Sequence, residues 1–296
     1  MHSSSILFGL CLTTFVSARG YYPRANTSPD SSCVGAGAVH MIVARASTEA
    51  PGEGVIGSVA TRVKAALPGS DSESVVYPAT LTQYQSSEAS GVAAMTKLIQ
   101  DYAARCPGSK IAVMGYSQGA HVAADVMCGT SETGFDGSSQ PLSADVASNV
   151  VAMVLMGDPS SVSGETFNAG TSKNQGLFPR QNIAACPSEK TVSYCDSMDQ
   201  FCDSGISLQV HLSYVMKYGT AAAKFITDKV SAQATSSNSS TSIATSSSAS
   251  GAAGLSKGVF TRASTSGAVK GGVELGWGVM VAGLGLGLGL GLGVWV

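Results

Sequence analysis

The sequence predicts an α/β fold in which helices cover both faces of a central parallel sheet. Short apolar runs of strand length alternate along the chain with longer segments that carry apolar residues at helical spacing. The short runs are apolar throughout, which is typical of strands buried on both faces. Ser47, Ser117 and Asp158 each follow such a run, at the strand ends where parallel sheets bind ligands.

Each predicted element has a local signal in the sequence. Residues 38–46, AVHMIVARA, form a continuous apolar run that indicates a buried strand. Residues 54–67 have apolar side chains at helical spacing, and Pro68 and Gly69 end that helix. The same criteria predict, in order, a strand at 74–80, a helix at 90–106, a strand at 110–117, a helix at 119–128, a strand at 149–159 and a last helix at 218–230.

Residues 1–18 have the pattern of a secretory signal peptide. Their apolar core is too short to span a bilayer, and it ends in residues suited to signal peptidase just before and at Ala18. We expect cleavage after Ala18, a flexible segment over residues 19–30 and one folded domain over residues 31–230. A buried N-terminal helix is the alternative for the first segment.

The other end of the chain predicts a lipid anchor. Residues 231–274 are a linker rich in Ser and Thr, and residues 275–296 form a terminal apolar tail in which Gly recurs. A small-residue stretch, a polar spacer and an apolar tail are the pattern of a GPI-attachment signal, with Ser264 or Ser266 as the attachment residue. A transmembrane anchor or a buried strand are the alternatives. We expect a secreted protein held at the cell surface or cell wall, with membrane contact only through the anchor.

Composition excludes several functions and predicts disulfides. A net charge of −2 with 12% charged residues gives no electrostatic case for binding nucleic acid. Six cysteines remain once Cys11 leaves with the signal peptide, and an even number in a secreted chain predicts three disulfides. The chain has no CxxC pair and no HExxH, so we expect neither metal nor cofactor, and we expect a monomer. The N-glycosylation sequons at Asn26 and Asn238 flank the domain.

Ser117 is the strongest candidate for chemistry. It lies in GYSQG, a G-x-S-x-G pentapeptide between the strand at 110–117 and the helix at 119–128. In this context the glycines permit a sharp turn that exposes the serine oxygen and directs the helix N-terminus toward it. The pattern predicts that Ser117 is a nucleophile.

A nucleophilic serine needs a base, and the chain has four histidines. His2 is in the signal peptide, and His40 is inside a predicted buried strand. His121 lies one helical turn after Ser117 and is expected to pack rather than reach the serine oxygen. His211 comes just before the last helix, where a loop can return over the edge of the sheet. We therefore assign His211 as the base.

The third member of a triad orients the imidazole and stabilises its charged form. CDSMDQFC, residues 195–202, has Asp196 and Asp199 inside a loop that Cys195 and Cys202 can close. Spacing does not choose between the two aspartates. Either one gives the chain order Ser, Asp, His of α/β-hydrolases.

Four separated motifs resemble the fungal cutinase and acetylxylan esterase family over residues 31–230. They are VARASTE at 43–49, GYSQGA at 115–120, YCDSMDQFC at 194–202 and HLSYVMKYG at 211–219. The resemblance implies a minimal, lidless α/β-hydrolase fold. It also implies Ser117 as nucleophile, His211 as base and Asp199 as the orienting acid.

The same resemblance implies the oxyanion hole and the disulfide pairing. The oxyanion would be held by the backbone N–H groups of Ser47 and Gln118, and the family has glycine where this chain has Ala46. The implied disulfides are Cys33–Cys106, Cys128–Cys186 and Cys195–Cys202, of which the second is shared with acetylxylan esterases.

The predicted function is that of a serine carboxylic-ester hydrolase that deacetylates plant cell-wall polysaccharide. LMGDPSS and the segment 167–180 resemble the acetylxylan esterase branch. The alternative substrate is cutin or another acyl ester, because apolar residues before and after His211 resemble the rim by which cutinases contact acyl chains; they are Ile206, Leu208, Val210 and Leu212. Core packing is the alternative interpretation of these apolar residues. For Asp158 the two alternatives are that it stabilises its own loop or that it contacts sugar hydroxyls. A non-catalytic, anchored wall protein with an esterase fold is a third hypothesis, whereas a polysaccharide-binding module lacks an aromatic platform.

Overall fold

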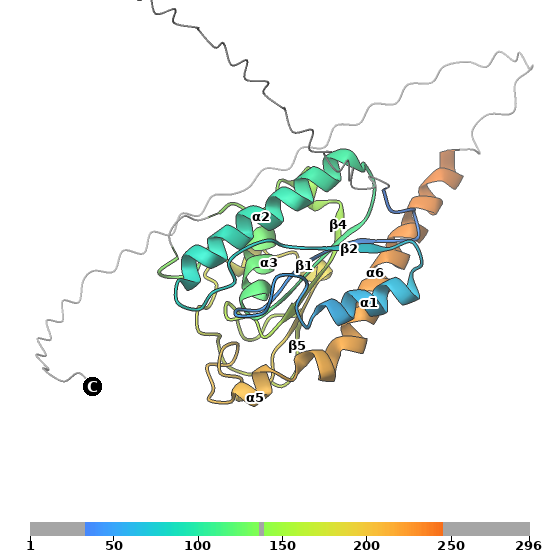
Figure 1. The fold of residues 1–296 in the computed structure, drawn as a ribbon. Helices are drawn as coiled ribbons and strands as arrows, with labels where there is room; N and C mark the ends of the chain where they lie inside the picture. Colours follow the sequence, from blue (N-terminus) through green and yellow to red (C-terminus); the bar gives the residue numbers. More distant parts are fainter. Residues whose placement is uncertain (1–32, 136–138, 245–296) are drawn as a thin grey trace, which may run out of the picture. The chain divides into compact units, whose positions relative to one another are not determined.

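Six parallel strands form the sheet of the computed structural model, which describes residues 33–135 and 139–244 (Figure 1). Their order across the sheet is β2-β1-β3-β4-β6-β5. The strands are β1 (His40–Ala44), β2 (Asp71–Ser74), β3 (Ile111–Tyr116), β4 (Val150–Met156), β5 (Asn168–Ala169) and β6 (Thr191–Tyr194). The helices are α1 (Gly57–Ala66), α2 (Tyr84–Arg105), α3 (Gln118–Cys128), α4 (Ala144–Ala147), α5 (Leu208–His211) and α6 (Tyr214–Ala244), with short 3₁₀ turns at Ile183–Ala185 and Ser188–Lys190.

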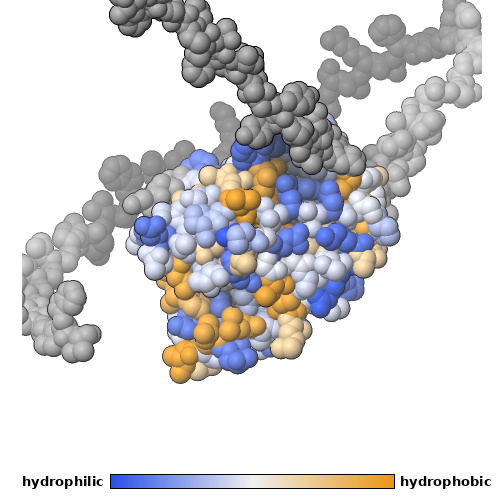
Figure 2. Space-filling model, viewed as in Figure 1, coloured by the Kyte–Doolittle hydropathy of each residue, from blue (hydrophilic) through white to orange (hydrophobic). Residues whose placement is uncertain are grey.

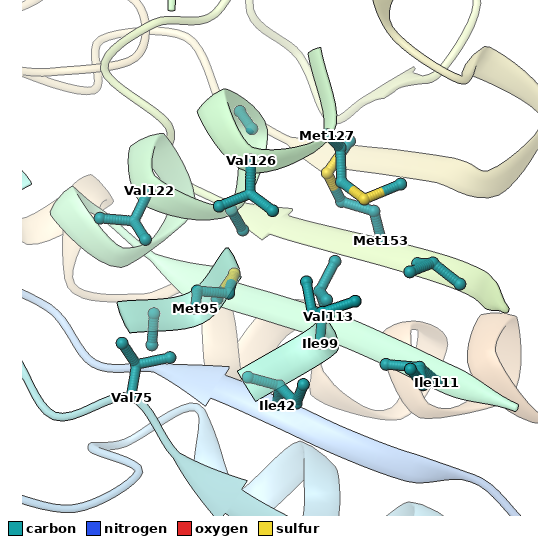
Figure 3. Close-up of a cluster of buried hydrophobic side chains, with 14 of the residues drawn as sticks. Ile42, Val75, Met95, Ile99, Ile111, Val113, Val122, Val126, Met127 and Met153 are labelled. Atoms are coloured by element: carbon teal, nitrogen blue, oxygen red, sulfur yellow. The ribbon is translucent and has the colours of Figure 1, made fainter. Parts of the chain in front are cut away.

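One face of the sheet is covered by α2 and α3. Successive side chains of a strand point to opposite faces, so alternate residues of β1, β3 and β4 meet these helices. Figure 3 shows Ile42 and Val113 of the strands packed among Met95 and Ile99 of α2 and Val126 of α3. The apolar residues that predicted the strands therefore form this half of the core.

The other face is covered by α1 and α6 (Figure 1). Met41, Val43 and Met114 point to this side and join a second cluster with Val59 of α1 and Ile226 of α6. Both faces of the sheet are buried under helices. The predicted α/β fold with a central parallel sheet is confirmed.

Three strands differ from the sequence prediction. The strand expected at 74–80 is wrong, because β2 is the polar segment Asp71–Ser74, which pairs with β1. The apolar stretch that follows leaves the sheet, with Val75 buried and Val76 84% exposed. β2 is an edge strand, so pairing with one neighbour holds it without apolar side chains on both faces. β5 and β6 are too short and polar for the criterion of a continuous apolar run.

The four predicted helices keep their positions but differ at their ends, and the short helices α4 and α5 are additional, so His211 lies in a helix and not in the expected loop. α2 begins at Tyr84 instead of residue 90, and α6 begins at Tyr214 and continues to Ala244, past the domain boundary expected at residue 230. Within the described ranges, no helix is both long enough and apolar enough to span a membrane.

Several predictions concern residues outside this description. They are the signal peptide (1–18), the segment 19–30, the sequon at Asn26, the attachment residues Ser264 and Ser266, and the tail 275–296. The side chain of Asn238 also lies outside the described part of the chain.

Three disulfides link the described cysteines, two of them between segments far apart in the sequence. They are Cys33–Cys106, Cys128–Cys186 and Cys195–Cys202, the pairing that the family resemblance implies. The first ties the start of the described chain to the end of α2, and the second ties the end of α3 to a 3₁₀ turn. The third closes the loop that follows β6.

Candidate active site

Ser117 occupies a strained turn between β3 and α3. Its φ of +55° and ψ of −119° lie in a region that non-glycine residues rarely adopt. A Cβ at Gly115 would lie 1.9 Å from the Gly119 carbonyl oxygen, and a Cβ at Gly119 would lie 2.2 Å from the Ala44 carbonyl oxygen. Both glycines of G-x-S-x-G are thus required, because the turn brings β3, α3 and β1 into backbone contact.

His211 lies at the end of α5 and is 3% exposed. Its Nδ1 is 2.9 Å from Asp199 Oδ2. The Tyr116 hydroxyl donates a hydrogen bond to the His211 carbonyl, and the two rings are 5.7 Å apart. Because Tyr116 directly precedes Ser117, this bond holds α5 beside the serine turn.

Asp199 is fully buried and accepts hydrogen bonds on both carboxylate oxygens. Oδ1 accepts from the N–H groups of Phe201 at 2.7 Å and Cys202 at 2.9 Å, and Oδ2 accepts from the Tyr214 hydroxyl at 2.8 Å. Burial by itself raises the pKa of Asp199, but the hydrogen bond and charge of His211 and these N–H groups hold the pKa below its usual value. The carboxylate is therefore ionised where it meets the imidazole.

Asp196 has different partners, although it lies in the same disulfide loop. Its carboxylate contacts Lys217 Nζ at 2.6 Å, the Tyr218 hydroxyl at 2.8 Å and the Thr171 hydroxyl at 3.1 Å. Burial opposes ionisation, yet these partners lower the pKa of Asp196. The geometry thus chooses between the two aspartates: Asp199 meets the histidine, and Asp196 ties the loop to α6.

The side chains of the remaining candidates have other partners. His40 is buried in β1 and bonded to Asp71 and Glu73 of β2, and His121 is fully buried in α3. Asp158 accepts from the N–H and hydroxyl of Ser160, each at 2.8 Å, so it stabilises its own loop.

Ser47 and Gln118 lie on the two segments that meet at the serine turn. Gln118 is the first residue of α3, and its side chain is fixed by Ser87 at 3.1 Å and by the carbonyl oxygen of Thr80 at 3.1 Å. First-turn N–H groups of a helix have no partner within the helix, which leaves the Gln118 N–H available. The Ser47 hydroxyl is buried and has no hydrogen-bond partner among the described residues.

The loop of Ser47 does not need the family's glycine. Ala46 is absent from the described residues with positive φ, whereas Thr48 has a φ of +67°. The Thr48 N–H donates to the Ala79 carbonyl at 2.7 Å, and Glu49 accepts from the Ala46 N–H at 2.7 Å. Ala46 is therefore tolerated, because positive φ in this loop falls on Thr48 and not on Ala46.

Sequence reasoning missed two tyrosines that hold the site together. Tyr116 bonds the backbone of His211, and Tyr214 bonds the carboxylate of Asp199. Neither spacing nor residue type distinguishes them from core tyrosines. Their closeness in sequence to Ser117 and His211 is the only signal that could have found them.

The apolar rim predicted around His211 is mostly at the surface. Ile206 is 84% exposed, Leu208 50% and Leu212 60%, while Val210 is half-buried. Core packing is therefore the wrong interpretation for the first three. Figure 2 shows hydrophobic side chains gathered at the end of the molecule where α5 lies in Figure 1.

The parallel sheet, the serine turn after β3 and the adjoining Asp–His pair define the α/β-hydrolase class. A family model described as Cutinase matches residues 35–230, and the chain belongs to the cutinase family. It is thus a cutinase-family carboxylic ester hydrolase, and the family predicted from the sequence motifs is confirmed.

The named relatives include both a cutinase and acetylxylan esterases. Cutinase 11 of Verticillium dahliae is 35% identical over 202 residues, which are 65% of this chain and 68% of that protein. Acetylxylan esterase 2 of Talaromyces purpureogenus is 34% identical over 203 residues, 65% of this chain and 87% of that protein. The solved catalytic core domain of acetyl xylan esterase from Trichoderma reesei has a TM-score of 0.63 at 34% identity, covering 67% of this chain and all of that one.

Proposed function

We propose that the chain is a secreted serine esterase that cleaves acetyl esters of xylan through Ser117, His211 and Asp199. The observation that carries this proposal is the buried Asp199–His211 pair, bonded through Tyr116 to the strand that ends at the strained serine. An ionised carboxylate on Nδ1 leaves Nε2 of the imidazole as the proton acceptor.

The reaction proceeds in two steps through an acyl-enzyme. Ser117 Oγ attacks the ester carbonyl carbon while His211 Nε2 takes the serine proton. The N–H groups of Ser47 and Gln118 hold the oxyanion, and each such donor is worth about 3 kcal/mol of transition-state stabilisation. His211 then returns the proton to the leaving alcohol. Water attacks the acyl-enzyme by the same route and releases the acid.

Substitution of the nucleophile tests catalysis and the non-catalytic alternative together. Ser117→Ala should lower kcat on nitrophenyl acetate by about 10⁴- to 10⁶-fold with little change in the thermal midpoint. If the chain is instead an anchored wall protein without catalytic function, the unmutated chain should not hydrolyse nitrophenyl acetate. A variant that retained most of its activity would exclude Ser117 as nucleophile.

Two observations support acetylated xylan as the substrate class. The protein has the Cys128–Cys186 disulfide, which by the family resemblance is a feature of the acetylxylan branch. It also aligns with most of the length of a relative named acetylxylan esterase 2.

Cutin is the second candidate, and the exposed rim favours it. Ile206, Leu208 and Leu212 offer apolar side chains to an insoluble acyl polymer. Nitrophenyl esters of two to sixteen carbons, assayed beside acetylated xylan and cutin, separate the two. Fastest hydrolysis of the acetyl ester with acetate release from xylan supports the first candidate. Fastest hydrolysis at four carbons or more with monomer release from cutin supports the second.

For the whole chain we infer secretion after removal of residues 1–18 and a lipid anchor attached at Ser264 or Ser266. The small-residue stretch, polar spacer and apolar tail of residues 264–296 support the anchor. Release of the enzyme from intact cells by phosphatidylinositol-specific phospholipase is the expected result. Release by detergent alone, with no effect of the phospholipase, would contradict it.

A further inference from the structure

A second group of buried ionisable side chains lies between α2 and α3, apart from the catalytic constellation. Glu88 is on α2, His121 and Asp125 are one turn apart on α3, and Glu132 follows that helix. One ligand atom from each of Glu88, His121 and Asp125 lies within 4.8 Å of the others. Exposure is 2% for Glu88, 0% for His121 and Asp125 and 4% for Glu132. Neither the mechanism nor the family motifs use these residues.

Three polar atoms of this group have no hydrogen-bond partner among the described residues: His121 Nε2, Glu88 Oε1 and Glu132 Oε1, of which the last forms an ion pair with Arg180 at 2.9 Å. Nε2 is 3.7 Å from Asp125 Oδ1 and 3.8 Å from Glu132 Oε1, which is too far for hydrogen bonds. Ligands about 2.1 Å from a tetrahedral metal lie about 3.4 Å from one another. A shift of a few tenths of an ångström would therefore bring His121 Nε2 and these two oxygens, both of which also contact Arg180, to metal-ligand spacing. The Glu88 atom lies within 4.8 Å of those of His121 and Asp125.

The group also contains more buried carboxyl groups than permanent cations. Glu88, Asp125, Glu132 and the neighbouring Asp158 are four buried carboxyl groups, and Arg180 is a permanent cation that forms ion pairs with two of them. Arg180 reaches Asp125 at 2.6 Å and Glu132 at 2.9 Å. Uncompensated charge in a buried place is costly, so the carboxyl groups that Arg180 does not contact must be protonated or balanced by a further positive charge, which a protonated His121 or a bound cation would supply.

The surroundings of these residues resemble the outer shell of a metal site. The Tyr84 hydroxyl is 3.2 Å from His121 Nδ1, which leaves Nε2 as the ligand atom. Asp125 Oδ2 accepts from the Thr130 hydroxyl at 2.6 Å. A pocket of about 340 Å³ beside the group is lined in part by Glu88 and Thr130.

We propose that Glu88, His121 and Asp125, completed by Glu132, bind one divalent transition-metal ion, with Zn²⁺ the best match to one imidazole and several carboxylates. The ion would join α2 to α3, the helix that begins beside Ser117, and would have a structural role. This proposal goes beyond the esterase function and does not depend on it. It also departs from the expectation of no metal, which rested on linear motifs.

Metal content and thermal stability test the proposal without any measurement of hydrolysis. The full secreted protein is stripped with chelator, incubated with excess Zn²⁺, freed of unbound ion by gel filtration and analysed for zinc. We expect about one equivalent of zinc and a rise in the thermal midpoint of about 5 °C or more relative to the stripped protein. Less than about a tenth of an equivalent with an unchanged midpoint would overturn the proposal and leave a protonated, hydrated cluster.

Matched variants identify the ligands. His121→Gln should lose the bound zinc and the thermal shift, whereas His40→Gln, which alters another buried histidine held by carboxylates, should keep both. Glu88→Gln, of nearly equal shape, should weaken zinc binding at least tenfold and serves if His121→Gln does not fold. Equal zinc retention by the unmutated chain, His121→Gln and Glu88→Gln would overturn the assignment.

Discussion

Asp196 and Asp199 show that spacing in the sequence does not by itself identify the residue that orients the histidine. Both lie inside the loop closed by Cys195 and Cys202, and both are ionised by strong hydrogen-bond partners. Only Asp199 points toward His211, because the N–H groups at the end of the loop hold its carboxylate from the other side. The sequence leaves the pair undecided, since the difference is one of direction.

Exchange of each aspartate for asparagine should separate their roles. We expect Asp199→Asn to lower kcat on nitrophenyl acetate by about 10⁴-fold, because an amide cannot fix the imidazole tautomer or stabilise its charge. Asp196→Asn should lower kcat by less than about tenfold, because its partners are on α6 and the neighbouring loop. Thermal midpoints of both variants control for folding. The reverse ranking would move the acid to Asp196.

Gly157, at the end of β4, tests how closely the histidine is packed. It has a φ of +64°, and a Cβ there would lie 2.8 Å from His211 Cε1 and 2.9 Å from Nδ1. Gly157→Ala should therefore displace the imidazole and lower kcat by about 10²-fold or more. Gly164→Ala is the matched control, because Gly164 also has positive φ, +86°, but a Cβ there would have no other atom within 4 Å. Equal losses of activity in the two variants would attribute the effect to backbone strain.

At the scale of single residues, the sequence predicts what linear patterns encode. Ser117 follows from its pentapeptide, and His211 follows by elimination among the histidines. The bonds from Tyr116 and Tyr214 arise only when β3, α5 and α6 come together. No local pattern encodes such contacts, which is why sequence reasoning missed them.

At the scale of elements, burial decides which predictions succeed. β1, β3 and β4 are buried along their whole length, and each appears in the sequence as a continuous apolar run. β2 is polar because it is an edge strand, and β5 has only two residues. Strands of this kind are held by backbone pairing with a neighbour, which leaves little trace in side-chain hydrophobicity.

The contact between α2 and α3 depends on Gly91. A Cβ at this position would lie 2.6 Å from Val122 Cγ2 and 3.0 Å from Tyr77 Cδ2. Gly91→Ala gains up to about 1 kcal/mol of helix propensity but overpacks this contact, so we expect a net loss of about 1–2 kcal/mol in the free energy of unfolding by urea.

Gly219→Ala provides the comparison for Gly91. Gly219 is also within a helix, α6, and its nearest neighbour is the flexible end of the Arg62 side chain at 3.2 Å. That variant should be neutral or more stable, since the propensity gain meets no packed core. Destabilisation of both helices to the same extent would show that Gly91 is not specifically required for the contact.

At the scale of the whole molecule, the candidate active site lies at the carboxyl ends of the strands, and a buried charged cluster around His40 lies at their amino ends. Ser117 and the loops of Asp199 and His211 lie beyond the carboxyl ends of the strands, as expected for parallel sheets. His40, the first residue of β1, lies at the opposite end and is stacked on Tyr102 of α2 with ring centroids 3.8 Å apart. It contacts Asp71 at 2.7 Å and Glu73 at 2.8 Å, so one side chain joins β1, β2 and α2.

The interactions of His40 with Asp71 and Glu73 should make the free energy of unfolding depend on pH. Burial by itself lowers the pKa of His40, but the hydrogen bonds and charges of Asp71 and Glu73 outweigh it and raise the pKa above its ordinary value of 6.5. A group whose pKa is raised by folding binds its proton more tightly in the native state. Its stabilisation is therefore fully present below about pH 6.5 and is lost as the pH rises through the folded-state value.

The difference in free energy of unfolding between the unmutated chain and His40→Gln should accordingly be larger at about pH 5.5 than at about pH 9. Urea titrations at the two pH values, with disulfides intact, measure it. Lys97→Gln removes an exposed ion pair with Asp101 on α2 and should change stability by less than about 1 kcal/mol at either pH. A His40→Gln difference that stayed constant, or grew toward high pH, would mean that His40 contributes through its shape and stacking on Tyr102 and not through its charge.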